Sequence, residues 1–255
     1  MTWTLEPRAR QRIDADQEAL AQNASTTPGY DNYPTSITST LPANSNFTFG
    51  RHYALLNLDL INALVGSVAP SPAGQAFINN TATFINAAHA LSPPPLQIFT
   101  RIYFANARKP EVNPNGGFAT VAGSTGNALV GANSTGSMVY PAFTVDAAAG
   151  DLTLQKTRYY AGAGNALEQI LESQGIDTVV LSGIRTSGVI LSTAYRLFDL
   201  DYKVYVIANN TIETPPDTPG INAAILEGVL PKLPANVITI EQALGALKRS
   251  GPAVY

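Results

Sequence analysis

The chain has 255 residues, enough for one large domain, and 45% of them are hydrophobic, so a sizeable core is expected. Its formal net charge of −3 provides no basic field that would hold a nucleic acid. Cysteine is absent, which excludes disulfides, thiolate metal ligands and a thiol nucleophile. Residues 1–22 lack the apolar segment of a secretion signal, and no apolar run is long enough to span a bilayer. We therefore expect a cytoplasmic protein with no membrane segment.

Residues 1–50 are polar and rich in Ser, Thr, Asn and Pro. They are expected to form an N-terminal arm that contains a short helix near 6–21. The arm is either a partly ordered tail or a segment that packs on a neighbouring subunit.

From Tyr53 onward, apolar runs that are typical of buried parallel strands alternate with helical segments. The expected strands are 53–59, 96–104, 152–156, 178–183, 203–208 and 237–240, and the expected helices are 73–91, 163–174, 187–199, 218–228 and 241–248. This alternation predicts βαβ units. The fold expected for 51–255 is therefore a three-layer α/β/α domain with a mainly parallel, Rossmann-like sheet of about six strands.

The stretch 105–151 interrupts this pattern, because it is dense in Gly, Asn and Ser and has little periodicity. Long inserts of this kind are uncommon in compact domains and often cover a site. The insert is interpreted as either a lid or a surface excursion without a role.

Several familiar motifs are incomplete in this chain. The Gly-rich stretches 123–131 and 161–166 lack both a Walker ending and a complete dinucleotide fingerprint after a strand. There is no G-x-S-x-G elbow. The histidines are His52 and His89 only, which argues against a catalytic zinc site in a chain without cysteine. We therefore predict no metal and no cofactor, and interpret both histidines as structural.

Chemistry-bearing residues do follow three of the expected strands. Asp59 ends the first, Lys156 ends the third, and the strand 178–183 leads into GIRTSGV (183–189), which opens a helix. The carboxyl ends of parallel strands meet at one edge of a sheet. A carboxylate, an ammonium and a helix N-terminus are thus expected to face one pocket.

The residues around these positions resemble the isochorismatase-like (cysteine hydrolase) superfamily. ALLNLDLINALV (54–65) is similar to the opening strand that carries the family's catalytic Asp. The stretch 154–213, from LQKTRYYAGAG to VYVIANNTIE, and the closing VLPKLPANVITIEQALGAL (229–247) are similar to later family segments. The resemblance implies an α/β/α hydrolase that forms a homo-oligomer, a dimer or a tetramer.

By the same resemblance, Asp59 is the catalytic acid/base, Lys156 is its partner, and Val189 stands where the family has its nucleophilic Cys. The resemblance also implies a cis peptide bond between Ile184 and Arg185, with the backbone N–H groups of Arg185 and Val189 forming an oxyanion hole. Arg185 itself departs from the family, which often has a small residue there. Its side chain either enters the pocket and pairs with a substrate carboxylate or points to solvent.

The chain retains one further feature of the family and lacks two others. After the catalytic Asp, the chain has Ile61 where the family often has Gln, and it retains the family's Asn as Asn62. The His-bearing metal motif that nicotinamidases have after the second strand is absent from this chain. The residues expected to bind a small-molecule substrate are Asn62, Arg101, Tyr160, Arg185 and Ser187.

A valine cannot act as a nucleophile, so the covalent thioester route is closed. Isochorismatases proper, which cleave a vinyl ether, also work without this Cys. The preferred hypothesis is a hydrolase that uses Asp59 and Lys156 as an acid/base pair on a small carboxylated or carbonyl-bearing metabolite. Two alternatives remain: a catalytically inactive relative that binds a ligand or partner, and a hydrolase with Ser187 as nucleophile. Whether Asp59 is an acid or a base depends on burial, which raises its pKa, and on Lys156, which lowers it.

Overall fold

The computed structural model describes residues 38–215 and 220–255, and the helix expected near 6–21 lies outside them. A single sheet of six parallel strands forms the centre of the molecule, in the order β3-β2-β1-β4-β5-β6. The strands are β1 (Tyr53–Leu58), β2 (Gln97–Ile102), β3 (Leu152–Lys156), β4 (Thr178–Ile184), β5 (Lys203–Ile212) and β6 (Asn236–Ile238). All six correspond to predicted strands.

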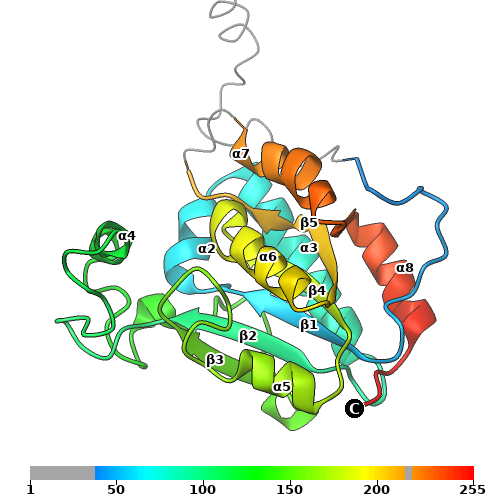
Figure 1. The fold of residues 1–255 in the computed structure, drawn as a ribbon, viewed down its shortest axis with the longest axis horizontal. Coiled ribbons are helices and arrows are strands. Elements are labelled where there is room, and N and C mark those ends of the chain that lie inside the picture. Colours follow the sequence, from blue (N-terminus) through cyan, green and yellow to red (C-terminus); the bar gives the residue numbers. More distant parts are fainter. Residues whose placement is uncertain (1–37, 216–219) are drawn as a thin grey trace, which may run out of the picture.

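Helices cover both faces of the sheet (Figure 1). The helices are α2 (Asn62–Val68), α3 (Pro72–His89), α4 (Phe118–Ser124), α5 (Leu167–Ser173), α6 (Leu191–Asp199), α7 (Ile221–Ala223) and α8 (Ile240–Ser250). Apolar side chains of α5 and α6 pack on one face, and those of α3 and α8 on the other. The predicted three-layer α/β/α fold is therefore confirmed.

The period-2 geometry of β1 explains why its sequence is apolar at every position except Asn57. Ala54 and Leu56 point into the core under α5 and α6, whereas Tyr53 and Leu55 point into the core under α3 and α8. Both sets are buried, as expected for a central parallel strand. The strand ends one residue earlier than predicted, because Asp59 turns out of the sheet with φ of 57°.

Two of the helices within the described residues, α2 and α4, were not predicted. Helix α2 follows directly on the apolar run of β1, so its sequence reads as part of that run. Helix α4 is short, contains a Gly near its end and lies in the Gly-rich stretch. By contrast, the predicted helix 73–91 is present as α3. Pro72 is its first residue, and the Ser71 hydroxyl caps it by accepting from the Gly74 amide at 2.9 Å.

The insert 105–151 is folded rather than structureless. Besides α4 it contains short 3₁₀ turns, and its Ala122 and Leu129 pack with Ile61 and Phe104 in a small buried cluster. The ammonium of Lys109 lies over the Phe104 ring, 5.2 Å from its centroid. The loops around α4 extend to the left in Figure 1, beyond the ends of β2 and β3.

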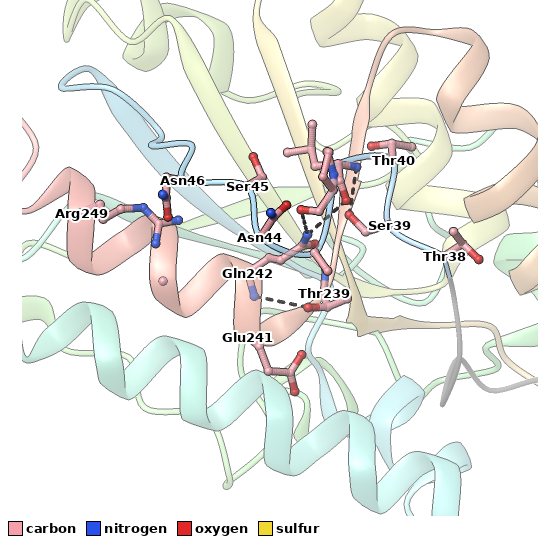
Figure 2. A pocket seen from close by; sticks show the side chains of 14 residues that line it. Thr38, Ser39, Thr40, Asn44, Ser45, Asn46, Thr239, Glu241, Gln242 and Arg249 are labelled. Carbon is pink, nitrogen blue, oxygen red and sulfur yellow. Dashed lines mark hydrogen bonds between the residues drawn. The ribbon is translucent and has the colours of Figure 1, made fainter.

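The described part of the expected N-terminal arm packs on its own domain. The Thr40 amide donates to the Val237 carbonyl of the edge strand β6 at 2.9 Å. Phe47 stacks on Tyr205 with ring centroids 5.3 Å apart. Between residues 38–46 and α8 there is an open groove of about 990 Å³, and most of the residues that line it are of polar types (Figure 2). Among the described residues, no helix is both long and apolar enough to cross a membrane.

Candidate active site

The order of the strands determines where a site is expected. The chain proceeds outward from β1 to β3 on one side of the sheet and from β4 to β6 on the other, so the connections reverse between β1 and β4. Ligands of open parallel sheets bind at such a switch point, outside the carboxyl ends of the strands. Asp59 follows β1 at this point, and β4 ends there at Ile184.

Gly183 allows the two central strands to come close beside Asp59. A Cβ at this position would lie 2.2 Å from the carbonyl oxygen of Leu58, and the φ of Gly183 is +150°. Any other residue would push β4 away from β1 at the site.

Asp59 and Lys156 form a buried ion pair, with 2.6 Å between Oδ2 and Nζ. Because β2 separates β3 from β1, the Lys156 side chain reaches Asp59 across β2. The same ammonium donates to the carbonyls of Arg158 at 2.7 Å and Tyr159 at 3.2 Å. Its three N–H groups are thereby engaged, so Lys156 orients Asp59 and the loop after β3 rather than contacting a substrate.

Thr100 on β2 is a third member of this cluster, and it was not predicted from the sequence. Its hydroxyl donates to Asp59 Oδ1 at 2.7 Å and accepts from the Asp59 amide at 2.9 Å. In the sequence it is one polar residue in a strand, and only the pairing of β1 with β2 reveals its role.

Replacement of Thr100 by Val is expected to destabilise the protein by about 1–3 kcal/mol, because the buried amide of Asp59 loses its acceptor. It should also raise the pKa of Asp59 further, since the Thr100 hydrogen bond lowers it. Urea unfolding measures the first effect and the pH dependence of activity the second. Thr81→Val is the matched control: Thr81 is fully buried and its hydroxyl has no hydrogen-bond partner within the described chain. Equal destabilisation by both variants would contradict the assignment.

Burial has the largest effect on the pKa values of the pair. It raises the pKa of Asp59 above its ordinary value, against the opposing effects of Lys156 and Thr100. It also lowers the pKa of Lys156, against the opposing effect of Asp59. A carboxyl whose pKa is raised in this way is suited to donate a proton.

The segment after β4 forms the opposite wall. The Ile184–Arg185 peptide bond is cis, which confirms that expectation. A π-helical turn, Thr186–Ile190, then leads into α6. Val189 is buried and lines the same cavity as Asp59. Its correspondence to the family Cys stays a prediction. The oxyanion role of the Arg185 and Val189 amides stays a prediction.

The cavity at this site has a volume of about 130 Å³. Its charged lining residues are Asp59, Arg158 and Arg185, and most others are apolar. The insert contributes one wall through Phe118, Val121, Ala122, Ser124, Thr125 and Leu129. The insert thus lies where a cover would lie, as one of the two interpretations expects.

Arg185 is the one expected substrate-binding side chain among the residues that line this cavity. The Asn62 amide donates to the Thr135 carbonyl at 2.8 Å, and Arg101 donates through Nε to the Ser137 carbonyl at 2.6 Å, so both hold the insert. Tyr160 is half-buried, donates to Glu168 at 2.7 Å and does not line the cavity. Ser187 is exposed.

Arg158 and Tyr159 line the cavity, whereas the expected Tyr160 does not. The Arg158 guanidinium lies over the Phe118 ring, 4.8 Å from its centroid, and Tyr159 packs edge-to-face on Phe118. The family-like segment that begins LQKTRYYAGAG includes both residues. Which of its side chains point inward depends on the turn after β3.

The two histidines lie elsewhere. His52 Nδ1 is 2.9 Å from the Val254 carbonyl, and His89 Nε2 is 2.9 Å from Asp151 Oδ2. Within 38–215 and 220–255, no three His, Cys, Asp or Glu side chains converge as metal ligands do. The larger groove beside α8 (Figure 2) lies at the β6 edge and has no charged pair like Asp59–Lys156, so the switch-point cavity is the better candidate site.

The switch point of a doubly wound parallel sheet is a common binding site for small molecules, and here a buried carboxylate–ammonium pair lies at it. The family model of the isochorismatase domain matches residues 53–242. The chain belongs to the isochorismatase family of hydrolases. Among curated proteins, none matches the sequence significantly.

Solved structures share this fold. The chain is similar to an isochorismatase family protein from Burkholderia thailandensis, with 24% identity, a TM-score of 0.60, and coverage of 80% of this chain and 100% of the other. It is also similar to a cysteine hydrolase from Pseudomonas syringae pv. phaseolicola, with 13% identity, a TM-score of 0.66, and coverage of 78% and 93%. N-carbamoylsarcosine amidase from Thermoplasma acidophilum matches with 19% identity, a TM-score of 0.58, and coverage of 74% and 96%.

Proposed function

We propose that this protein hydrolyses a small carboxylated or carbonyl-bearing metabolite without a covalent cysteine intermediate, with Asp59 as the general acid. One observation carries the proposal: the buried Asp59–Lys156 pair lies at a small cavity that Val189 also lines. In the proposal, Val189 stands where the family has its nucleophile. The pair is the part of the family machinery that does not need a thiol.

The chemistry suits cleavage of an enol ether or a related bond. Proton transfer from Asp59 to the substrate carbon creates an oxocarbenium ion, and water then attacks this ion and returns a proton to the Asp59 carboxylate. The resulting hemiketal breaks down to a ketone and the alcohol. The Asp59 carboxylate left behind stabilises the cation, and Lys156 keeps it oriented. No step requires a nucleophilic side chain.

The dimensions of the cavity support a small substrate. Its 130 Å³ are close to the roughly 150 Å³ of an engineered apolar cavity that takes a single benzene molecule. Apolar walls such as Phe104 and Leu129 suit the body of such a molecule, and Arg185 suits a carboxylate. A substrate of about one ring in size therefore fits best.

The alternative with Ser187 as nucleophile receives less support. The Ser187 side chain is exposed and does not line the cavity, whereas Asp59 and Val189 do. Its amide is bonded to Glu213 at 2.8 Å, which holds the turn in this orientation. Ser187→Ala should leave turnover unchanged.

The pH dependence distinguishes an acid from a base. Because burial raises the pKa of Asp59, the protonated form persists to higher pH than in a free Asp. If Asp59 donates the proton, kcat/KM is highest below this raised pKa and falls as pH rises through it. Because Asp59 and Lys156 titrate together, the apparent pKa belongs to the pair. A kcat/KM that rises with pH over the same range would identify Asp59 as a base instead.

The direct test is to incubate the purified protein with isochorismate and a panel of small enol ethers, amides and lactones, following products by mass spectrometry. Turnover of one class identifies the bond. Absence of turnover across the panel, together with tight binding of one member, would favour the alternative of an inactive ligand-binding relative. The cytoplasmic location and the homo-oligomeric state also belong to the proposal, and light scattering tests the second.

A further inference from the structure

Glu213 is a buried carboxylate at the edge of the proposed site, and the mechanism above does not use it. It directly follows β5, and its side chain is 3% exposed. It does not line the cavity, so it does not contact a substrate directly. A buried charge is costly unless it is paired and hydrogen-bonded, so its partners indicate its role.

One carboxylate oxygen of Glu213 holds the turn at the position of the missing nucleophile. Oε2 accepts from the Ser187 amide at 2.8 Å, at the start of the π-helical turn Thr186–Ile190. The turn is packed tightly here: a Cβ at Gly188 would lie 2.9 Å from the Tyr159 ring and 3.1 Å from Arg185 Cγ. The position of this turn therefore determines the positions of Val189 and Arg185.

The other oxygen faces Arg185. Oε1 is 3.9 Å from Arg185 Nε and accepts from the Thr214 amide at 2.9 Å. The guanidinium donates further to the hydroxyls of Tyr159 and Thr214, and it lies over the Tyr159 ring, 5.3 Å from its centroid. Glu213 thus attracts the guanidinium without using up its hydrogen-bond donors, and the side chain stays 36% exposed at the cavity.

A break in the register of β5 places Glu213 opposite Arg185. Leu181 pairs with Val206, whereas Ile184 pairs with Ile212, so the offset between the strands grows from 25 to 28 residues. Without this bulge, Asn210 would lie beside Arg185, and the guanidinium would have a neutral neighbour. Bulges next to active sites commonly redirect a side chain in this way.

We propose that Glu213 is a positioning residue, whose single carboxylate anchors the turn at Ser187 and keeps the Arg185 guanidinium at the cavity to receive a ligand carboxylate. The proposal rests on the proposed function only for the class of ligand. Binding measurements test it without turnover, so its failure is distinguishable from the absence of catalysis.

The direction in which anion affinity changes distinguishes a positioning role of Glu213 from a purely electrostatic role. The lining charges besides the Asp59 pair are the guanidinium groups of Arg158 and Arg185, so loss of a nearby negative charge alone would strengthen binding of an anion. Loss of position would weaken it. The probes are benzoate, a carboxylate of about one ring, and benzamide, its uncharged counterpart, measured by calorimetry.

We expect the wild-type protein to bind benzoate at least about tenfold more tightly than benzamide, and Glu213→Gln to lose most of this preference. Arg185→Ala should lose the same preference, with no further loss in the double variant. Glu168→Gln, which disrupts the exposed pair of Glu168 and Arg196, is the matched control and should keep it. Unchanged or tighter benzoate binding in Glu213→Gln, or a wild type without the preference, would overturn the proposal.

Amide hydrogen exchange supplies a readout that needs no ligand. In Glu213→Ala the Ser187 amide should exchange at least about tenfold faster, while amides of β1 keep their protection. If that variant does not fold, the Glu213→Gln binding result still decides the question. Unaltered exchange at Ser187 in folded Glu213→Ala would refute the anchoring of the turn.

Discussion

Asp59→Asn is expected to lower turnover by about two to four orders of magnitude while the protein stays folded. General acid catalysis contributes a factor of this size, and an amide cannot supply the proton. Folding should survive because the carbonyl of the substituted side chain can still accept from Lys156, and its NH₂ group can donate to the Thr100 hydroxyl, which now accepts. Steady-state kinetics on the substrate found in the panel measures the loss, and circular dichroism checks the fold.

The matched control for this experiment is Asp151→Asn. Asp151 is also buried and also has a basic partner, His89 at 2.9 Å, but it lies outside the cavity. The control should therefore lose some stability and keep its turnover. Folded Asp59→Asn protein with full activity would eliminate the Asp59 mechanism, whatever the control does.

Lys156→Met is expected to destabilise the protein by about 3–5 kcal/mol at neutral pH, because it leaves the Asp59 carboxylate buried without its partner. The carbonyls of Arg158 and Tyr159 also lose their donor, so the loop that carries these residues into the cavity should loosen. Urea unfolding followed by circular dichroism measures the change.

The stability that Lys156→Met loses relative to wild type is expected to become smaller as the pH falls. Without the ammonium, burial raises the pKa of Asp59 further above its unfolded-state value. A group with a raised folded-state pKa contributes stability that is present at low pH and is lost as pH rises through that pKa. The deficit of Lys156→Met relative to wild type should therefore shrink under mildly acidic conditions.

Lys248→Met is the control for this variant, since Lys248 is exposed in the last turn of α8. It should change stability by no more than about 0.5 kcal/mol. A Lys156→Met protein as stable as this control at neutral pH would show that the ion pair does not hold the site together.

Much of the sheet could be predicted because central parallel strands are apolar on both faces and stand out as short hydrophobic runs. The strand β5 was predicted only to 208, because Asn209, Asn210 and Thr211 look like a turn. In the structure Asn210 and Thr211 are fully buried and continue the strand past its bulge. That error concealed Glu213, which would otherwise have appeared as a third acidic or basic residue at the end of a strand.

The layered α/β architecture, the family resemblance, the absence of a thiol and the candidate pair of Asp59 and Lys156 at strand ends could all be inferred from the amino-acid sequence. These follow from local periodicity and from residue identity, which need no knowledge of contacts. The tertiary structure alone decided that burial prevails in the pKa of Asp59, because desolvation depends on how other elements enclose a group. It likewise decided that Arg185 faces the cavity, and that Thr100 and Glu213 support the site, because strand register and one bulge bring these distant residues together.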